Sequence, residues 1–99
     1  MKLLTKAIEK TLPKFYETEY VPVNDKEIKV KFFNPTGQGT WYACEYDPEQ
    51  KMFYGYVELF EGEWGCFSLE ELESVKLPWG MSIERDLHFT PCKFSELNL

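Results

Sequence analysis

The sequence predicts an α+β fold: a small antiparallel β-meander sheet of about four or five strands, covered by short helices. Apolar and polar residues alternate through several segments between residues 28 and 67. Short turn sequences separate these segments, and short turns join antiparallel neighbours. A helix-capping pattern then follows directly after the last of them.

The chain opens with a short amphipathic helix. Leu4, Ile8 and Leu12 recur at helical spacing, with lysines on the other faces. Thr5 is an alternative start, as the N-cap of this helix. Pro13 disfavours helix at the residue before it and therefore ends the helix. The aromatic, irregular residues 15–24 indicate an extended surface connector or an edge strand.

The first predicted strand carries Ile28, Val30 and Phe32, which alternate with lysines and indicate a half-buried strand. The glycines and proline of residues 34–39 end it, and residues 40–46 form the second strand. Strict alternation predicts that three side chains of this second strand share one face: Trp41, Ala43 and Glu45.

A turn then leads into the third strand, residues 52–60, and a second turn into the fourth, residues 64–67. The apolar face of the third strand is expected to consist of Phe53, Gly55, Val57 and Leu59.

A helix follows, with Ser68 as its N-cap and Glu71 three residues later. Its buried side is expected to consist of Leu69, Leu72 and Val75. Residues 83–90 predict a last strand with Leu87 and Phe89 facing inward, and Phe94 and Leu97 lie in a terminal turn.

Length and composition indicate one folded domain spanning residues 1–99, since 17% of the residues are aromatic. The N-terminus has charges where a signal peptide needs an apolar core. No stretch approaches the roughly 20 apolar residues of a membrane span. The three cysteines lack CxxC spacing, so we expect reduced thiols and a cytoplasmic protein with no membrane partner.

The net charge of −6 is unevenly distributed. Residues 45–73 hold nine carboxylates and one lysine, whereas residues 1–31 hold seven lysines and five carboxylates. The acidic middle argues against direct nucleic-acid binding, which needs clustered basic residues. A basic-arm nucleic-acid binder is the alternative, and it would use Lys2, Lys6, Lys10, Lys29 and Lys31.

An ordered series of residues resembles a known family. The series comprises Phe33, Pro35, Trp41-Tyr42, Glu45-Tyr46-Asp47-Pro48, Phe53-Tyr54-Gly55-Tyr56-Val57, Glu63-x-Gly65-x-Phe67-Ser68-Leu69-x-x-Leu72, Ile83-Glu84-Arg85-Asp86 and Phe89-x-Pro91. In this order it resembles the short bacterial proteins grouped as domain of unknown function 2958. No enzymatic activity is attached to this family, so the resemblance carries none over to this sequence. It does imply an association with phages, plasmids and other mobile elements, and hence a role in contests between mobile DNA and host.

No catalytic residues are expected. His88 is the only histidine, and the sequence lacks a nucleophile elbow, a phosphate-binding loop and a dinucleotide-binding glycine motif. The spacing of Cys44, Cys66, His88 and Cys92 matches no common zinc module. We therefore expect no metal and no cofactor.

The candidate binding residues lie in the acidic, aromatic middle and in one later polar cluster. They are Trp41, Glu45, Asp47, Tyr54, Tyr56, Glu61, Glu63, Glu84, Arg85 and Asp86. Because interface cores favour tyrosine and tryptophan, the first hypothesis is a non-catalytic acidic protein, monomer or homodimer, that binds another protein. In a more specific form, it is an anti-defence or regulatory factor whose partner is a basic nucleic-acid-binding protein.

The alternative hypothesis is a small-molecule or nucleotide-binding domain, with or without weak enzymatic activity. Its site would bring together Trp41, Glu45, Arg85 and Asp86. Arg85 could reach a carboxylate such as Glu45 in a bidentate ion pair. The cluster Glu84-Arg85-Asp86 is then either a structural salt-bridge network that ties the C-terminal segment to the sheet or a polar recognition site near Trp41.

Overall fold

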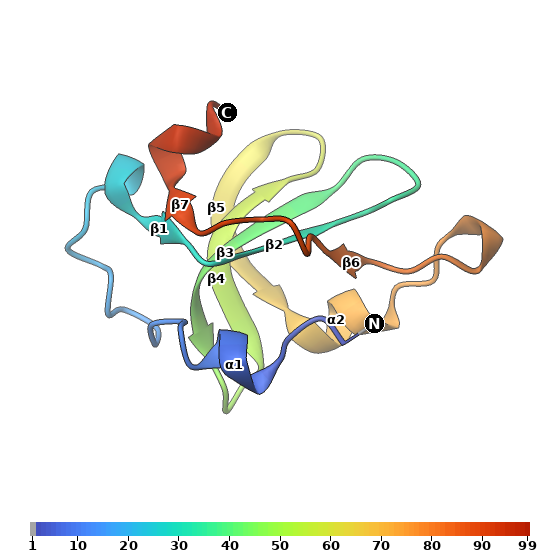
Figure 1. Ribbon diagram of the computed structural model, residues 1–99, viewed down its shortest axis with the longest axis horizontal. Helices are drawn as coiled ribbons and strands as arrows, with labels where there is room; N and C mark the ends of the chain where they lie inside the picture. Colours follow the sequence, from blue (N-terminus) through green and yellow to red (C-terminus); the bar gives the residue numbers. More distant parts are fainter. Residues whose placement is uncertain (1) are drawn as a thin grey trace.

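The computed structural model describes residues 2–99. Its main element is a five-stranded antiparallel sheet with strand order β5-β4-β3-β2-β6 (Figure 1). Its strands are β2 (Val30–Phe33), β3 (Thr40–Asp47), β4 (Met52–Glu58), β5 (Gly62–Ser68) and β6 (Glu84–Arg85). A separate two-stranded antiparallel sheet pairs β1 (Glu27–Ile28) with β7 (Cys92–Lys93). The predicted antiparallel meander is confirmed, because β2, β3, β4 and β5 are neighbours in both sequence and space.

Helices are few and short in the described residues. Two are α-helices, α1 (Lys6–Glu9) and α2 (Leu69–Ser74), and three are single 3₁₀ turns, η1 (Val23–Asp25), η2 (Pro78–Gly80) and η3 (Phe94–Leu97). None of them has the length and apolar composition needed to cross a membrane.

The main core covers one face of the five-stranded sheet. Phe53 lies at its centre, with ring centroids 5.3 Å from Phe32 and 5.2 Å from Phe67. The N-terminal segment, α1 and α2 supply the covering side chains, which are Leu3, Leu4, Ile8, Leu12, Leu69 and Leu72.

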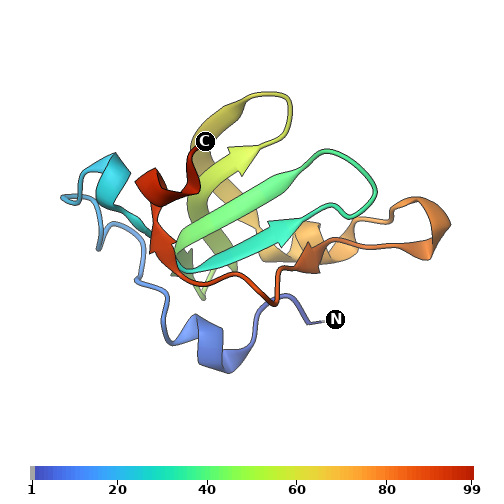
Figure 2. The same ribbon diagram turned by 45° about the horizontal axis from the view of Figure 1, so that its top comes forward.

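A second, smaller core lies on the opposite face. Ile28, Tyr42 and Cys44 are buried there. Phe94 of η3 packs on Tyr56 and Trp64, each with ring centroids 4.9 Å away. The two-stranded sheet and η3 therefore cover only part of this face (Figure 2).

The N-terminal helix is shorter than predicted. Thr5 is its N-cap and accepts a hydrogen bond from the Ile8 amide at 3.2 Å. The helix extends only from Lys6 to Glu9, which is about one turn. Leu3 and Leu4 are buried before the helix begins. The alternative edge strand over residues 15–24 is wrong, because turns and η1 occupy that segment.

The first predicted strand divides at Lys29, whose amide donates to the Ala43 carbonyl. Ile28 consequently packs in the smaller core, while Val30 and Phe32 pack in the main core. Strand β4 ends at Glu58, two residues earlier than predicted, which leaves Leu59 exposed in the turn.

Two predictions at the C-terminal side are also wrong. Val75 is exposed because α2 ends at Ser74. Leu87 is 65% exposed because Asp86 turns the chain: its side chain accepts the His88 amide and its carbonyl accepts the Phe89 amide. Only Glu84 and Arg85 of the predicted strand over residues 83–90 are in a strand. Phe94 and Leu97 do form the predicted terminal turn.

The predicted N-cap is confirmed, since the Ser68 hydroxyl accepts a hydrogen bond from the Glu71 amide at 3.1 Å. We expect Ser68→Ala to lower the free energy of unfolding by about 1 kcal/mol, because one amide of the first turn loses its acceptor. Ser82→Ala, in the exposed loop before β6, is the control and should change little. Urea denaturation measures both; equal stability of the two variants would contradict the cap's contribution.

Candidate functional site

Three connections leave the same end of the five-stranded sheet (Figures 1 and 2). The terminal row of paired residues is Glu84, Phe33, Thr40, Glu58 and Gly62, in spatial order. The β2–β3 turn, the β4–β5 turn and the η2 loop before β6 all leave the sheet at this row. We call these connections, residues 34–39, 59–61 and 78–83, the loop end.

The loop end exposes large apolar side chains. Phe60 is 97% exposed at the β4–β5 turn, and Trp79 is 86% exposed on η2. Leu59 and Met81 are exposed beside them. Several exposed apolar side chains at one end of a small protein are typical of an interaction surface, whereas single scattered ones are ordinary.

The backbone holds Trp79 in an unusual conformation. Its φ of 59° lies in the left-handed region, which is uncommon for a bulky side chain. The Leu77 amide donates to the Met81 carbonyl at 3.0 Å, and the Met81 amide donates to the Pro78 carbonyl at 3.2 Å. These bonds close the loop and fix where Trp79 projects. Unfavourable backbone conformations of this kind cluster at functional sites.

Carboxylates surround the β4–β5 turn. Glu61 and Glu63 are exposed and Glu58 is half-buried. No lysine or arginine occurs from Met52 through Val75. The side of the loop end that carries Phe60 is therefore acidic.

Part of the predicted binding set lies at or next to the loop end. Glu61 belongs to the β4–β5 turn, and Glu63 and Trp41 lie in the second row of the sheet. The Trp41 ring and Leu59 both lie against Gly39 of the β2–β3 turn. Glu84 lies in the terminal row, on the β6 side.

Other predicted residues lie elsewhere. Asp47 is at the opposite end of β3, where its carboxylate accepts the Glu49 amide at 3.0 Å. Tyr56 is half-buried, with its ring against Trp64 and Phe94. Asp86 forms an ion pair with Lys31 at 3.7 Å. These three side chains stabilise local structure and do not converge on one site.

A β-bulge overturns the predicted face of Glu45. The pairing of β3 with β4 shifts between Ala43 and Glu45, which inserts Cys44 as an extra residue. Glu45 therefore lies opposite Tyr54, on the face away from Trp41.

The predicted ion pair between Arg85 and Glu45 is wrong for the same reason. Arg85 pairs with Phe32 in the register of the main core face, and its guanidinium donates to the Leu3 carbonyl at 2.9 Å. It also donates to the Lys2 carbonyl and so anchors the N-terminal segment. The sheet separates the predicted small-molecule site of Trp41, Glu45, Arg85 and Asp86 into two faces.

Glu45 is 4% exposed, so it is not part of the acidic surface. Its carboxylate accepts hydrogen bonds from the Tyr16 amide at 3.0 Å, the Thr18 amide at 3.1 Å and the Thr18 hydroxyl. Lys26 is 7% exposed and donates to the Thr18 carbonyl and, at 3.4 Å, to the Thr18 hydroxyl. Thr18 and Lys26 were not among the predicted residues, because no local pattern marks a buried lysine.

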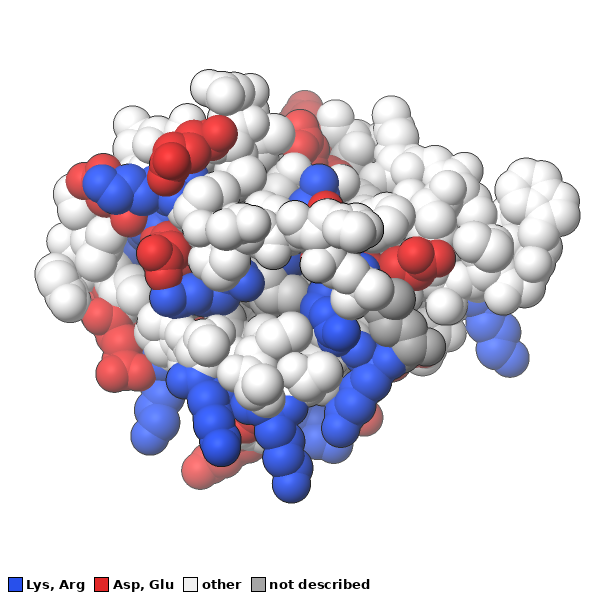
Figure 3. Space-filling model, viewed as in Figure 1, with Lys and Arg blue, Asp and Glu red and all other residues white. Residues whose placement is uncertain are grey.

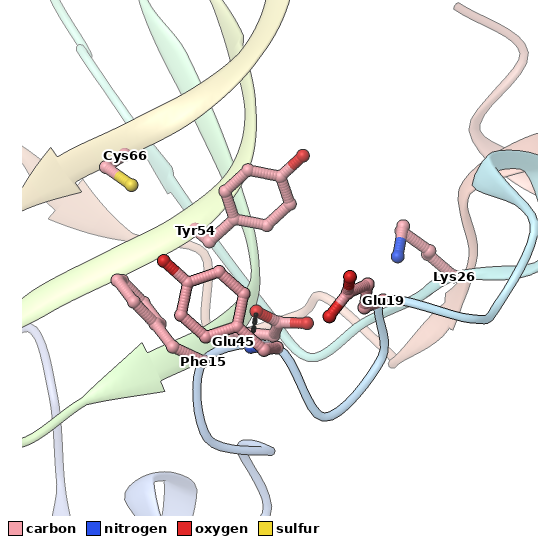
Figure 4. Close-up of a pocket in the computed structure, with 7 residues that line it drawn as sticks. Phe15, Glu19, Lys26, Glu45, Tyr54 and Cys66 are labelled. Atoms are coloured by element: carbon pink, nitrogen blue, oxygen red, sulfur yellow. Dashed lines mark hydrogen bonds between the residues drawn. The ribbon is translucent and has the colours of Figure 1, made fainter.

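A cavity of about 390 Å³ adjoins this network (Figure 4). It lies between the connector before β1 and strands β3, β4 and β5. The residues that line it are Phe15, Tyr16, Glu19, Lys26, Glu45, Tyr54 and Cys66. Of the predicted binding residues, Glu45 and Tyr54 are brought together here. The aromatic composition of residues 15–20 was the sequence signal that could have indicated a pocket wall.

Lysines gather on a different part of the surface. Figure 3 shows them along the lower border of that face, where Figure 1 places the N-terminal segment and α1. Lys2, Lys6 and Lys10 are exposed there. Lys29 pairs with Glu27, and Lys31 pairs with Asp86. Two of the five lysines of the basic-arm alternative are thus engaged with carboxylates.

The three cysteines are free thiols in different surroundings. Burial, followed by the nearby Glu45 carboxylate, raises the pKa of Cys44 to about 12. Burial also raises the pKa of Cys92, whereas Cys66 is exposed. Among residues 2–99, no group of three or more histidine, cysteine or acidic side chains is placed to hold a metal ion.

We expect iodoacetamide at about pH 8 to label Cys66 first, Cys92 more slowly and Cys44 only after unfolding, because the thiolate is the reactive form. The folded protein keeps the Cys44 thiol protonated at pH values above 9.0, the ordinary pKa of the thiol. The free energy of unfolding should therefore fall as the pH rises from 9.0 toward about 12. Mass spectrometry of timed samples gives the order. Rapid labelling of Cys44 in the folded protein would contradict its burial.

Fold and site together define a small antiparallel β protein with an exposed, apolar and acidic loop end. The chain belongs to the family described as protein of unknown function (DUF2958), which matches residues 3–96. The match confirms the family resemblance seen in the ordered residues of the sequence. No curated protein and no solved structure matches the chain.

Proposed function

We propose that the protein is a non-catalytic binding module that engages another protein through its loop end. The observation that carries the proposal is the exposure of Phe60 and Trp79 at the same end of one sheet. Removal of two such rings from water stabilises a complex, since aromatic side chains dominate interface energetics. In the proposed complex, the partner protein buries both rings.

The connections that carry the two rings leave the sheet within the width of one interface. The β4–β5 turn and β6 lie near opposite edges of the sheet, roughly 17 Å apart at about 4.8 Å between strands, and η2, which carries Trp79, leads into β6. A standard interface buries about 800 Å² per partner and covers that distance. Phe60 and Trp79 can therefore serve as two anchors of a single contact, with the β2–β3 turn between them.

The negative charge of the loop end favours a partner with a positively charged surface. Glu58, Glu61 and Glu63 complement a partner whose apolar pocket is bordered by lysine or arginine. In the more specific form of the proposal, that partner is a nucleic-acid-binding protein whose basic surface the carboxylates occupy. The mobile-element setting implied by the family resemblance would make it a host defence or regulatory protein.

Affinity capture from a lysate of the source organism tests the proposal. We expect Phe60→Ser and Trp79→Ser each to reduce the captured partner at least tenfold, as hot-spot residues do. Tyr20→Ser is the matched control, because Tyr20 is 84% exposed but lies outside the loop end. All three positions are exposed, so the variants should fold normally.

Salt provides a second readout in the same experiment. Capture by the unaltered protein should weaken as salt rises, because exposed charges are screened. Equal capture by the Phe60→Ser, Trp79→Ser and Tyr20→Ser variants would refute the loop end as the binding surface. Salt-independent capture that still requires Phe60 would refute only the basic partner.

A further inference from the structure

The cavity beside Glu45 has two chemically different ends (Figure 4). Phe15 and Tyr54 present aromatic rings at one end, whereas the carboxylates of Glu45 and Glu19 and the ammonium of Lys26 lie toward the other. Tyr16 adds a third ring to the lining. A ligand that fills the cavity therefore has an apolar body and a charged group.

Part of the aromatic lining is held in place before any ligand arrives, although Tyr16 itself is 76% exposed. Tyr54 stacks on Trp64 with ring centroids 5.8 Å apart. Tyr16 has a φ of 72°, in the left-handed region, and Glu45 fixes it by accepting its amide at 3.0 Å. The Phe15 ring meets the Tyr16 ring edge-on at 6.1 Å. Such preorganisation reduces the entropy lost when a ligand binds.

The sign of the charged end follows from its residues. Two carboxylates and one ammonium line the cavity, which leaves one net negative charge. The Lys26 ammonium already donates to the carbonyl and hydroxyl of Thr18. Glu19 is exposed and remains accessible to an incoming group. A monovalent cation would neutralise this site, whereas an anion such as a phosphate would face two carboxylates.

We propose that this cavity binds an organic monocation, a primary ammonium group attached to an apolar or aromatic body. The ammonium lies at the charged end of the cavity, beside the Glu19 carboxylate, and the side of it that faces the aromatic end is attracted by the tyrosine rings. The body of the ligand packs on Phe15 and excludes water. The cavity is separate from the loop end, so this site does not depend on the proposed protein-binding function.

Titration with three phenyl compounds of similar size tests the charge selection. The probes are phenethylamine, 2-phenylethanol and 3-phenylpropionate, which are cationic, neutral and anionic at neutral pH. We expect phenethylamine to bind saturably and to shift the NMR amide signals of Tyr16, Thr18 and Tyr54. The neutral probe should bind roughly three- to tenfold more weakly, because it lacks the charge.

Variants locate the site. Glu19→Gln should weaken phenethylamine binding roughly threefold, and Tyr54→Leu should weaken it more because both ring face and packing are lost. Glu73→Gln, an exposed carboxylate on α2, is the matched control and should leave binding unchanged. Trp79→Ser should also leave it unchanged, which separates this site from the loop end.

Two results would overturn the proposal. One is the absence of saturable binding of phenethylamine at millimolar concentration, with the Tyr16 and Thr18 amide signals unmoved. The other is equal binding of all three probes, because the cavity would then lack selection for positive charge. The Glu19→Gln variant should fold normally, since its side chain is exposed, so loss of binding in that variant cannot be attributed to unfolding.

Discussion

Replacing Gly55 with alanine should severely destabilise the folded state. A Cβ atom at this position would lie 1.8 Å from the Tyr42 carbonyl oxygen, which belongs to the backbone of the neighbouring strand β3. Backbone of a central strand cannot move aside without breaking the β3–β4 pairing. We expect a loss of more than about 4 kcal/mol, a large part of the roughly 5–15 kcal/mol that stabilises a native domain.

Gly65 offers a matched control for that substitution. It lies directly opposite Gly55 in the register of β4 with β5, yet a Cβ atom there meets no atom within 4 Å. Gly65→Ala should be neutral or should stabilise the protein by about 0.5 kcal/mol, since alanine restricts the unfolded chain. Circular dichroism and urea denaturation distinguish the variants. A folded Gly55→Ala protein with unchanged stability would contradict the described approach of the two strands.

Removing the Glu45 carboxylate should have the second largest effect. Glu45→Ala leaves the Tyr16 and Thr18 amides without their acceptor and removes the carboxylate to which Thr18 of the Thr18–Lys26 network is bonded. Leaving a buried donor without its acceptor costs about 1–3 kcal/mol, and Glu45 accepts from three donors. The part of the connector that holds Tyr16 and Thr18 should then detach from the sheet.

Two further variants make this prediction specific. Glu45→Gln keeps an oxygen acceptor and should lose less stability than Glu45→Ala. Glu49→Ala removes an exposed carboxylate in the next turn and should change stability by less than about 0.5 kcal/mol. Hydrogen exchange at Tyr16 and Thr18 reports the connector directly. If these amides stay protected in Glu45→Ala, the carboxylate is not what holds the connector.

The sequence predicted the middle of the fold well because its signals there are local. Strands β3 to β5 follow from alternation and from turn sequences only a few residues long. The Ser68 cap follows from two residues three positions apart. Features like these need no knowledge of distant parts of the chain.

The bulge at Cys44 could not be predicted in this way. Its extra residue lets the Tyr46 amide reach the Pro13 carbonyl at 2.9 Å and lets Glu45 bind the connector. The partners, Pro13 and Tyr16, lie about thirty residues earlier in the chain. Period-two alternation within a strand carries no information about contacts at that distance. One inserted residue moved Glu45 to the other face, and the predicted four-residue site was lost with it.

The candidate site was predicted in part. Glu61 and Glu63 were assigned to an acidic binding surface, and they border the loop end. Phe60 and Trp79 were missed, because Phe60 was assigned to a strand that ends at Glu58 and Trp79 carried no predicted role. The available signal in both places was an aromatic residue one or two positions before a glycine, Phe60 before Gly62 and Trp79 before Gly80.

Site-specific photocrosslinking tests the loop end most directly. A photoreactive phenylalanine analogue replaces Phe60, Trp79 or Tyr20, one position at a time, in cells of the source organism. We expect the same partner protein to be crosslinked from positions 60 and 79 and not from position 20. Crosslinks of equal yield from all three positions, or none from 60 and 79, would contradict a protein-binding loop end.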